Sequence, residues 1–225
     1  MPSSLRVMLV GATGLVGGHC LTQLLADDTF TEVVVPSRRA LPLEHPKLTV
    51  QILDFAKLRE HPELFQVDMV ICCLGTTRRK AGSRSAFRQV DYGYTRDVAE
   101  LAMQQRVRCF ILVSALGANS QSTFFYNRIK GRAEWAVRTL SFRTVHLVRP
   151  SLLLGKRRER RRREGLARWW LRLLSPVLLG PLRRFRPVEA ERVAGLLVHL
   201  ARSEELGQHV HYPSQHNGAV RERRG

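Results

Sequence analysis

The sequence predicts an α/β fold, built as a doubly wound parallel sheet in a single domain. Three observations support this prediction. Short runs rich in Val, Ile and Leu alternate along the chain with longer segments of helical periodicity. These runs are continuously apolar, which is typical of parallel strands that helices cover on both faces. The length of 225 residues suits one domain, and a hydrophobic content of 44% is enough for a packed core.

The predicted elements follow one another in strand and helix order. Strands are predicted at residues 5–10, 31–35, 48–53, 68–74, 109–114 and 145–148. Helices are predicted at residues 15–26, about 88–105, about 123–140 and 189–201. Residues 1–215 are expected to form one domain that contains a basic lid segment at residues 156–186, and residues 216–225 to form a polar tail.

The first predicted strand leads into a glycine loop with the spacing G-x-x-G-x-x-G. Gly11 permits a tight turn, Gly14 lets the backbone approach a diphosphate, and Gly17 permits close packing of helix on strand. Because the loop opens a helix, backbone N–H groups of the helix N-terminus would face the anion. This context predicts a Rossmann-type dinucleotide site, with a plain glycine turn as the alternative. The predicted cofactor contacts of the loop are Gly11, Thr13, Gly14, Leu15, Val16 and Gly17.

The end of the second predicted strand distinguishes the two nicotinamide cofactors. An acidic residue there would bind the ribose 2′-hydroxyl of NAD, whereas this chain has Arg38 and Arg39. A guanidinium suits the 2′-phosphate of NADP, since it forms paired, charge-assisted hydrogen bonds. The cofactor is therefore predicted to be NADP, with solvated loop charges as the alternative interpretation. Asp54, just after the third strand, is a candidate neighbour of the adenine or a turn residue.

The fourth predicted strand ends at Gly75, at the carboxyl edge where ligands bind in sheets of this type. Cys72 and Cys73 precede it, but adjacent strand residues point to opposite faces and cannot chelate one ion. The four cysteines are expected to be core thiols. The histidine pair His209 and His211 is expected to be structural, and no metal site is predicted.

Ser114, Tyr126 and Lys130 form the predicted catalytic set. Ser114 ends the fifth strand, while Tyr126 and Lys130 lie four residues apart on the next helix and so share one face. A phenol with an ordinary pKa of about 10 is a poor acid at neutral pH, and a nearby ammonium lowers that pKa. Ser114 would polarise the carbonyl of a small substrate as hydride arrives. A chance Tyr-x-x-x-Lys spacing is the alternative.

The formal net charge of +18 is concentrated in one segment. Residues 156–186 contain twelve Lys or Arg and two Glu, together with an apolar stripe that includes Trp169 and Trp170. An anionic partner or a membrane surface is a candidate ligand of this segment, nucleic acid is not favoured, and a solvated loop before a packed helix is the simpler alternative. No oligomeric state is predicted.

The N-terminus lacks the pattern of a signal peptide, and no apolar run approaches the roughly 20 residues of a membrane-spanning helix. A cytoplasmic location is therefore expected.

Five segments carry a combined motif pattern, at residues 11–17, 72–82, 114–118, 125–131 and 148–151. Together they resemble the Tat-interacting-protein-like branch of the atypical short-chain dehydrogenases/reductases, over about residues 5–155. The resemblance implies that NADPH contacts the glycine loop, the arginine pair, Leu74, Gly75, Tyr126 and Lys130. It also implies that the segment after Pro150 closes over the nicotinamide, with Leu153 beside the cofactor and Arg161 on its phosphates.

Two functions are consistent with these features. The first is an NADPH-dependent oxidoreductase that reduces a carbonyl substrate by hydride transfer. The second is an NADPH-responsive regulatory protein, or one that binds an anionic surface, without turnover.

Overall fold

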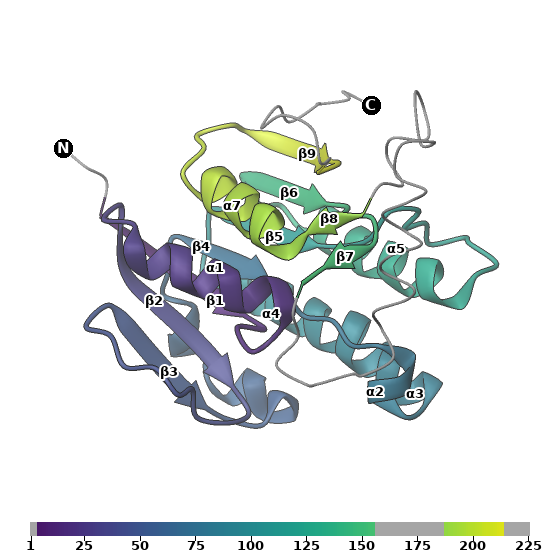
Figure 1. Ribbon diagram of the computed structural model, residues 1–225, viewed down its shortest axis with the longest axis horizontal. Helices are drawn as coiled ribbons and strands as arrows, with labels where there is room; N and C mark the ends of the chain where they lie inside the picture. Colours follow the sequence, from purple (N-terminus) through teal and green to yellow (C-terminus); the bar gives the residue numbers. More distant parts are fainter. Residues whose placement is uncertain (1–3, 156–186, 214–225) are drawn as a thin grey trace.

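The centre of the molecule is a seven-stranded sheet in the order β3-β2-β1-β4-β5-β6-β9 (Figure 1). The computed structural model describes residues 4–155 and 187–213. Every neighbouring pair of strands is parallel. The strands are β1 (Leu5–Val10), β2 (Phe30–Ser37), β3 (Leu48–Ile52), β4 (Met69–Cys72), β5 (Cys109–Val113), β6 (Thr144–Val148) and β9 (Gly207–His211), and a separate parallel pair consists of β7 (Leu153–Leu154) and β8 (Val188–Glu189).

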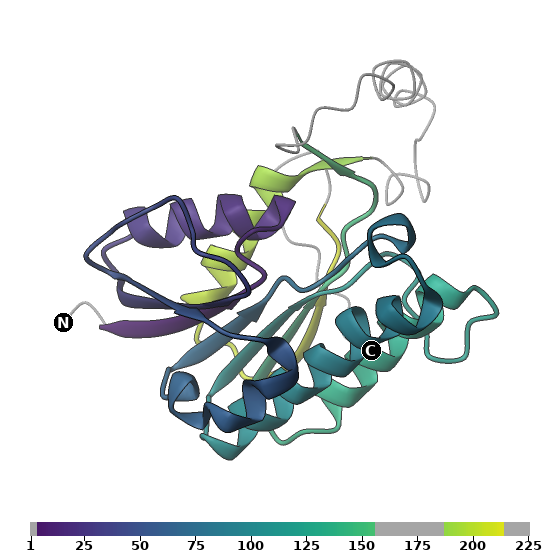
Figure 2. The same cartoon turned by 90° about the horizontal axis from the view of Figure 1, so that it is seen from below.

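Helices cover both faces of the sheet, which Figure 2 shows between its two helical layers. One layer contains α1 (Leu15–Ala26) and α7 (Ala190–Ala201), which pack against each other. The other contains α4 (Tyr94–Gln104) and α5 (Phe125–Arg138). Shorter helices occupy the connections, namely the 3-10 helices η1 (Phe55–Glu60) and η2 (Pro62–Phe65), α2 (Arg78–Ala81), α3 (Arg84–Arg88) and the π-helical turn η3 (Gln89–Gly93).

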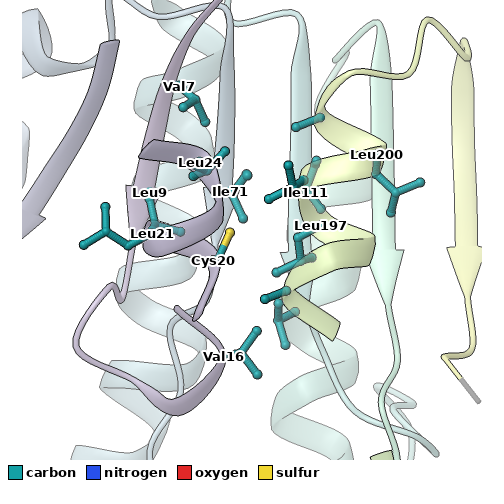
Figure 3. Packing of buried hydrophobic residues seen from close by; sticks show 14 of the residues in the cluster. Val7, Leu9, Val16, Cys20, Leu21, Leu24, Ile71, Ile111, Leu197 and Leu200 are labelled. Atoms are coloured by element: carbon teal, nitrogen blue, oxygen red, sulfur yellow. The ribbon is translucent and has the colours of Figure 1, made fainter. Parts of the chain in front are cut away.

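Each central strand sends alternate side chains into two separate cores. In β1, Val7 and Leu9 pack with α1 and α7, as Figure 3 shows, while Met8 and Val10 face the layer of α4 and α5. All four side chains are fully buried. Two covered faces explain why the strand sequences are apolar at every position rather than at alternate ones. The predicted doubly wound α/β fold is confirmed.

The edge strand β3 departs from this pattern. Residues 48–53 are predicted to be a strand covered on both faces, but every residue of β3 is half-buried or exposed, and Ile52 is 56% exposed. That part of the prediction is wrong. The strand pairs with β2 on one side only, because it ends the sheet.

The helix predicted at about 88–105 is not one regular helix. The chain forms α3, then the π-helical turn η3, and then α4. A π-helical turn inserts one residue into the hydrogen-bond ladder and changes which side chains face inward after it. Asp91 lies within η3 and is buried.

The order of the sheet reverses at β1 and β4. The chain runs from β1 outward through β2 and β3, and then crosses to β4 on the other side of β1. At such a switch point the loops after neighbouring strands diverge and leave a crevice at their carboxyl ends. The glycine loop follows β1, Gly75 follows β4 and Ser114 follows β5, so the predicted site residues of these loops lie on one edge of the sheet.

Candidate active site

The glycine loop forms a tight backbone turn at the start of α1. Gly11 has a φ of +87°, and the Gly14 N–H donates to the Gly11 carbonyl oxygen at 2.9 Å. A Cβ on Gly17 would lie 2.1 Å from that same oxygen, so only glycine fits there. Gly14 is the N-cap of α1 and brings no side chain to cap it. The first N–H groups of the helix therefore suit an external anion, and the loop fits a dinucleotide diphosphate.

Arg38 and Arg39 follow β2 in a turn that Ser37 holds. The Ser37 hydroxyl donates to the Arg39 carbonyl oxygen at 2.7 Å, and both arginines are exposed. Neither guanidinium is ion-paired with another described residue. Glu32, nearer the other end of β2, is instead paired with Arg6 at 2.7 Å. The two cations are thus available to a phosphate at the carboxyl edge, and their selection of NADP stays a prediction.

Asp54 has a local structural role. Its side chain caps η1 by accepting a hydrogen bond from the Ala56 N–H at 3.0 Å. The sequence indicated either a turn residue or a neighbour of the adenine at Asp54, and the structure shows the turn contact. Its contact with an adenine stays a prediction.

The centre of the candidate site is a buried ion pair that joins α5 to η3. The ammonium of Lys130 lies 2.9 Å from Asp91 Oδ1, and both side chains are almost completely buried. The other oxygen of Asp91 accepts a hydrogen bond from the Thr76 N–H at 2.8 Å. A Cβ on Gly75 would lie 3.4 Å from the Lys130 ammonium nitrogen. Because glycine has no side chain, the chain that follows β4 can approach the ammonium closely at this position.

The Asp91 carboxylate keeps Lys130 charged. Burial alone would lower the pKa of Lys130, but the negative charge of Asp91, the nearby Tyr126 and the hydrogen bond to Asp91 outweigh burial and raise it above its ordinary value. The ammonium is consequently a fixed positive charge within the site at every ordinary pH. Part of that charge is balanced by Asp91.

Sequence reasoning missed Asp91. The signal was present, since Phe87, Asp91, Thr95 and Val98 are spaced so that a helix would place them on one buried stripe. A carboxylate on such a stripe requires a buried partner. Its partner is Lys130, from a helix that begins more than thirty residues later, and no local pattern identifies it.

Ser114 and Tyr126 differ in their exposure to solvent. Ser114 directly follows β5 and is buried, and its hydroxyl has no hydrogen-bond partner among the described residues. A buried hydroxyl without a partner is costly, so this one suits a ligand atom. Tyr126 lies one turn before Lys130 on α5 and is 40% exposed, with its ring 5.9 Å from that of the buried Phe87. One hydroxyl thus lies at the floor of the site and one at its rim.

The segment after β6 returns over the glycine loop. Leu153 lies in β7 and packs against the core beneath α1, and a Cβ on Gly155 would lie 2.6 Å from Leu15 Cδ1. Gly155, two residues after Leu153, thus lies against Leu15, and the cofactor contacts of Leu15 and Leu153 stay predictions. Arg161, the basic lid at residues 156–186 and the polar tail at 216–225 lie outside the described residues, and their predicted roles and partners stay predictions.

A second ion pair holds α5 to the end of β6. The Arg149 guanidinium donates from Nε to Glu134 Oε1 at 2.9 Å and from an Nη to the Tyr212 hydroxyl at 3.0 Å. The hydrogen bond to Glu134 is the main reason that the pKa of Arg149 lies above its ordinary value. Glu134 follows Lys130 by one helical turn, so this pair fixes the helix that carries Tyr126 and Lys130.

Cys20, Cys72 and Cys109 are buried in the core, as predicted, and Cys73 is half-buried. Cys72 faces the core of α4 and α5, whereas its neighbour Cys73 packs against that of α1. Burial raises the pKa of Cys72 to about 11, which disfavours the reactive thiolate. The described residues contain no group of three or more His, Cys, Asp or Glu arranged to hold a metal ion.

His209 and His211 form a cluster with His146, which sequence reasoning missed. The Nδ1 atom of His146, in β6, lies 3.0 Å from Nε2 of His211, and the His209 ring stacks on that of His146. Burial, followed by the charges of His211 and His209, lowers the pKa of His146 to about 3. The pair His209 and His211 thus packs within the structure at the edge of the sheet.

Comparisons with known proteins agree with this geometry. A family model described as NAD(P)H-binding matches residues 11–163. Protein HTATIP2 of Rattus norvegicus is 39% identical over 166 residues, which cover 72% of this chain and 68% of that protein. Protein FMP52, mitochondrial, of Debaryomyces hansenii is 33% identical over 210 residues, covering 91% and 90% respectively.

Solved structures share the fold at low sequence identity. MoeE5 in complex with UDP-glucose and NAD has a TM-score of 0.71 at 17% identity, over 96% of this chain and 78% of that one. The Bordetella bronchiseptica enzyme WbmH in complex with NAD+ has a TM-score of 0.72 at 15% identity, over 96% and 77%.

None of the described helices is long and apolar enough to cross a membrane. The names of several fungal relatives contain the word mitochondrial, and the expected cytoplasmic location stays a prediction.

The family match covers more than half of the chain, and it includes the glycine loop, Gly75, Ser114 and the Tyr126/Lys130 helix. The relatives and the order of these motifs indicate the same protein family. The chain belongs to the NAD(P)H-binding Rossmann family, within the Tat-interacting-protein-like branch of the atypical short-chain dehydrogenases/reductases.

Proposed function

We propose that the protein is an NADPH-dependent oxidoreductase that reduces the carbonyl group of a small substrate. The observation that carries this proposal is the convergence on one sheet edge of a charged Lys130, the Tyr126 phenol and a Ser114 hydroxyl that has no partner among the described residues. A protein that only sensed the nucleotide would need the glycine loop but not a buried ammonium with its own carboxylate. The arrangement therefore favours turnover over binding alone.

Ser114, Tyr126 and Lys130 each have a different role in the proposed reaction. The bound cofactor would supply a hydride to the carbonyl carbon and leave as NADP+. Ser114 would donate a hydrogen bond to the carbonyl oxygen, which becomes negative as the hydride arrives. Tyr126 would transfer its hydroxyl proton to that oxygen, so that the product is an alcohol. The Lys130 ammonium would stabilise the phenolate until solvent returns the proton.

The preference for NADP rests on charge. Arg38 and Arg39 are exposed, lie beside the carboxyl end of β2 and have no described carboxylate partner. A phosphate on the adenosine ribose would give them one, whereas the plain ribose of NAD would leave both unpaired. Gly11, Gly14, Gly17 and the first turn of α1 would bind the diphosphate.

The test is the change of Tyr126 to Phe, which removes the hydroxyl and keeps the ring contact with Phe87. We expect kcat for NADPH oxidation with an aldehyde and ketone panel to fall by about 10²–10⁴-fold. The NADPH dissociation constant should change little, because the phenol is only one contact among many. Tyr94→Phe, on α4 beside Phe55, serves as the matched control and should retain full activity. Equal turnover by the wild type and Tyr126→Phe would contradict the mechanism.

A further inference from the structure

A cluster of cations lies on the rim of the candidate site. The segment between Gly75 and Asp91 forms α2 and α3, and it contains no Asp or Glu before Asp91. Asp91 Oδ1 lies 2.9 Å from the Lys130 ammonium nitrogen, and a Cβ on Gly75 would lie 3.4 Å from it, so both ends of this segment adjoin the site. Its basic residues are all exposed, and they are Arg78, Arg79, Lys80, Arg84 and Arg88.

Aromatic contacts connect one of these cations to α5, the helix that carries the predicted acid. The buried Phe87 of α3 has its ring 5.7 Å from that of Phe125 and 5.9 Å from that of Tyr126. The guanidinium carbon of Arg84 lies 5.4 Å from the centroid of the Phe125 ring. Phe125 directly precedes Tyr126 on α5. Arg84 is therefore held against the residue next to the catalytic phenol.

A second guanidinium approaches the same ring but is already bound. Arg128 lies 6.0 Å from the Phe125 centroid and donates hydrogen bonds to the carbonyl oxygens of Ser122 and Thr123, at 2.7 and 3.0 Å. Arg128 therefore adds positive charge near the Phe125 ring and holds the loop at Ser122 and Thr123 in place. Arg84 is the more available of the two, because its guanidinium has no hydrogen bond or ion pair with another described residue and its N–H donors can bind a ligand.

Three arginines around this rim carry charge that no described carboxylate balances. Neither Arg84 nor Arg88 nor Arg128 is ion-paired with a described carboxylate. On α4, by contrast, Arg96 is paired with Asp97, which also binds Arg59. Asp91, the first acidic residue after Gly75 in the sequence, already balances Lys130. Unbalanced charge of one sign around a site raises the local concentration of ligands with the opposite sign.

We propose that the substrate is an anionic carbonyl compound, and that Arg84 is the specificity-determining residue that binds its carboxylate or phosphate group. This inference rests on the proposed carbonyl reduction. A guanidinium binds either anion through two parallel N–H donors, which would orient the carbonyl relative to Tyr126. A neutral substrate would leave the Arg84 guanidinium without an anionic partner among the described residues.

The experiment compares three aldehydes of the same shape: 4-carboxybenzaldehyde, 4-formylphenyl phosphate and the neutral methyl 4-formylbenzoate. We expect the wild type to reduce the anions with a higher kcat/KM than the ester, and added salt to reduce that preference. Arg84→Gln should lower kcat/KM for the anions by about tenfold and leave the ester unchanged. Arg84→Lys should restore only part of the preference, because an ammonium lacks the planar fork.

Arg143→Gln is the control for net charge. Arg143 is also exposed, but it precedes β6 at the opposite edge of the sheet, so its loss should change none of the three rates. Equal kcat/KM for anions and ester in the wild type, or equal losses in Arg84→Gln and Arg143→Gln, would overturn the inference. A weaker NADPH affinity in Arg84→Gln would assign Arg84 to a cofactor phosphate and would overturn it as well.

A binding measurement separates this inference from the proposed reduction. NADP+-loaded protein cannot transfer hydride, so calorimetric titration with 4-carboxybenzaldehyde reports binding alone. If no aldehyde is reduced but the titration shows binding that Arg84→Gln weakens about tenfold, the anion site stands and the reductase proposal fails. If aldehydes are reduced but the two proteins bind the anion equally, the reductase proposal stands and the anion site is wrong.

Discussion

The glycine loop and the Lys130 centre are both polar sites at the carboxyl edge of one sheet, but they are built in different ways. In the loop, Gly14 and Gly17 both lie close to the Gly11 carbonyl oxygen within a span of seven residues, and the backbone itself would form the anion site. At the Lys130 centre, the ammonium is balanced by Asp91 from a different helix. A site formed by the local backbone is therefore readable from residue spacing, whereas the partner of a buried charge depends on tertiary packing.

The largest expected effect tests the Lys130 centre. Asp91→Ala would leave a buried ammonium without its counter-charge, and we expect the free energy of unfolding to fall by about 3–5 kcal/mol in urea titrations. Asp97→Ala on α4 is the control. Its partners Arg59 and Arg96 are half-exposed, so the loss of these ion pairs should lower the free energy of unfolding by no more than about 1 kcal/mol.

The double variant Asp91→Ala/Lys130→Met sharpens this test. It removes both charges, so it should recover part of the lost stability although it abolishes the predicted catalytic group. If Asp91→Ala and the double variant are equally destabilised, the ion pair is not the reason for the loss.

The next effect tests the glycine loop. Gly17→Ala would place a Cβ 2.1 Å from the Gly11 carbonyl oxygen, whereas at Gly18 the nearest atom would be 3.6 Å away. We expect Gly17→Ala to lose about 3 kcal/mol of stability and its measurable NADPH binding, because the turn must open. Gly18→Ala should bind NADPH like the wild type. Thermal unfolding with and without NADPH measures both quantities, and equal behaviour of the two variants would refute the tight-turn account.

A smaller effect on stability is expected from the histidine cluster. Its contacts, like the Lys130–Asp91 ion pair, join residues far apart in the chain. His146 has a folded-state pKa of about 3, while an unfolded histidine titrates at about 6.5. The unfolded state therefore binds a proton first as the pH falls, so this contribution is complete above about pH 6.5 and is lost between that pH and about 3. We expect the free energy of unfolding to decrease by about 2 kcal/mol from pH 7 to pH 5 from this group alone.

Urea unfolding at the two pH values would measure the contribution of His146. The His146→Gln variant should lose most of this pH dependence, whereas replacement of the exposed His199 by Gln should retain it. A pH dependence that is unchanged in His146→Gln would contradict the assignment.

Sequence reasoning predicted the features that depend on local order. The parallel sheet, its apolar central strands and the glycine loop before α1 follow from periodicity and spacing, and the structure confirms the fold. Three features did not follow from the sequence. The exposure of β3 depends on its position at the sheet edge, the π-helical turn interrupts a segment that reads as one helix, and the contacts of Asp91 and His146 join residues far apart in the chain.

The central claim is that the loop at Gly11–Gly17 binds a dinucleotide and that Arg38 and Arg39 select its phosphorylated form. The most direct measurement is calorimetric titration of the wild type and of Arg38→Ala/Arg39→Ala with NADPH and with NADH. We predict that the wild type binds NADPH at least about tenfold more tightly than NADH and that the double variant binds both alike. No heat with saturating NADPH, or a preference that the double variant retains, would contradict the account.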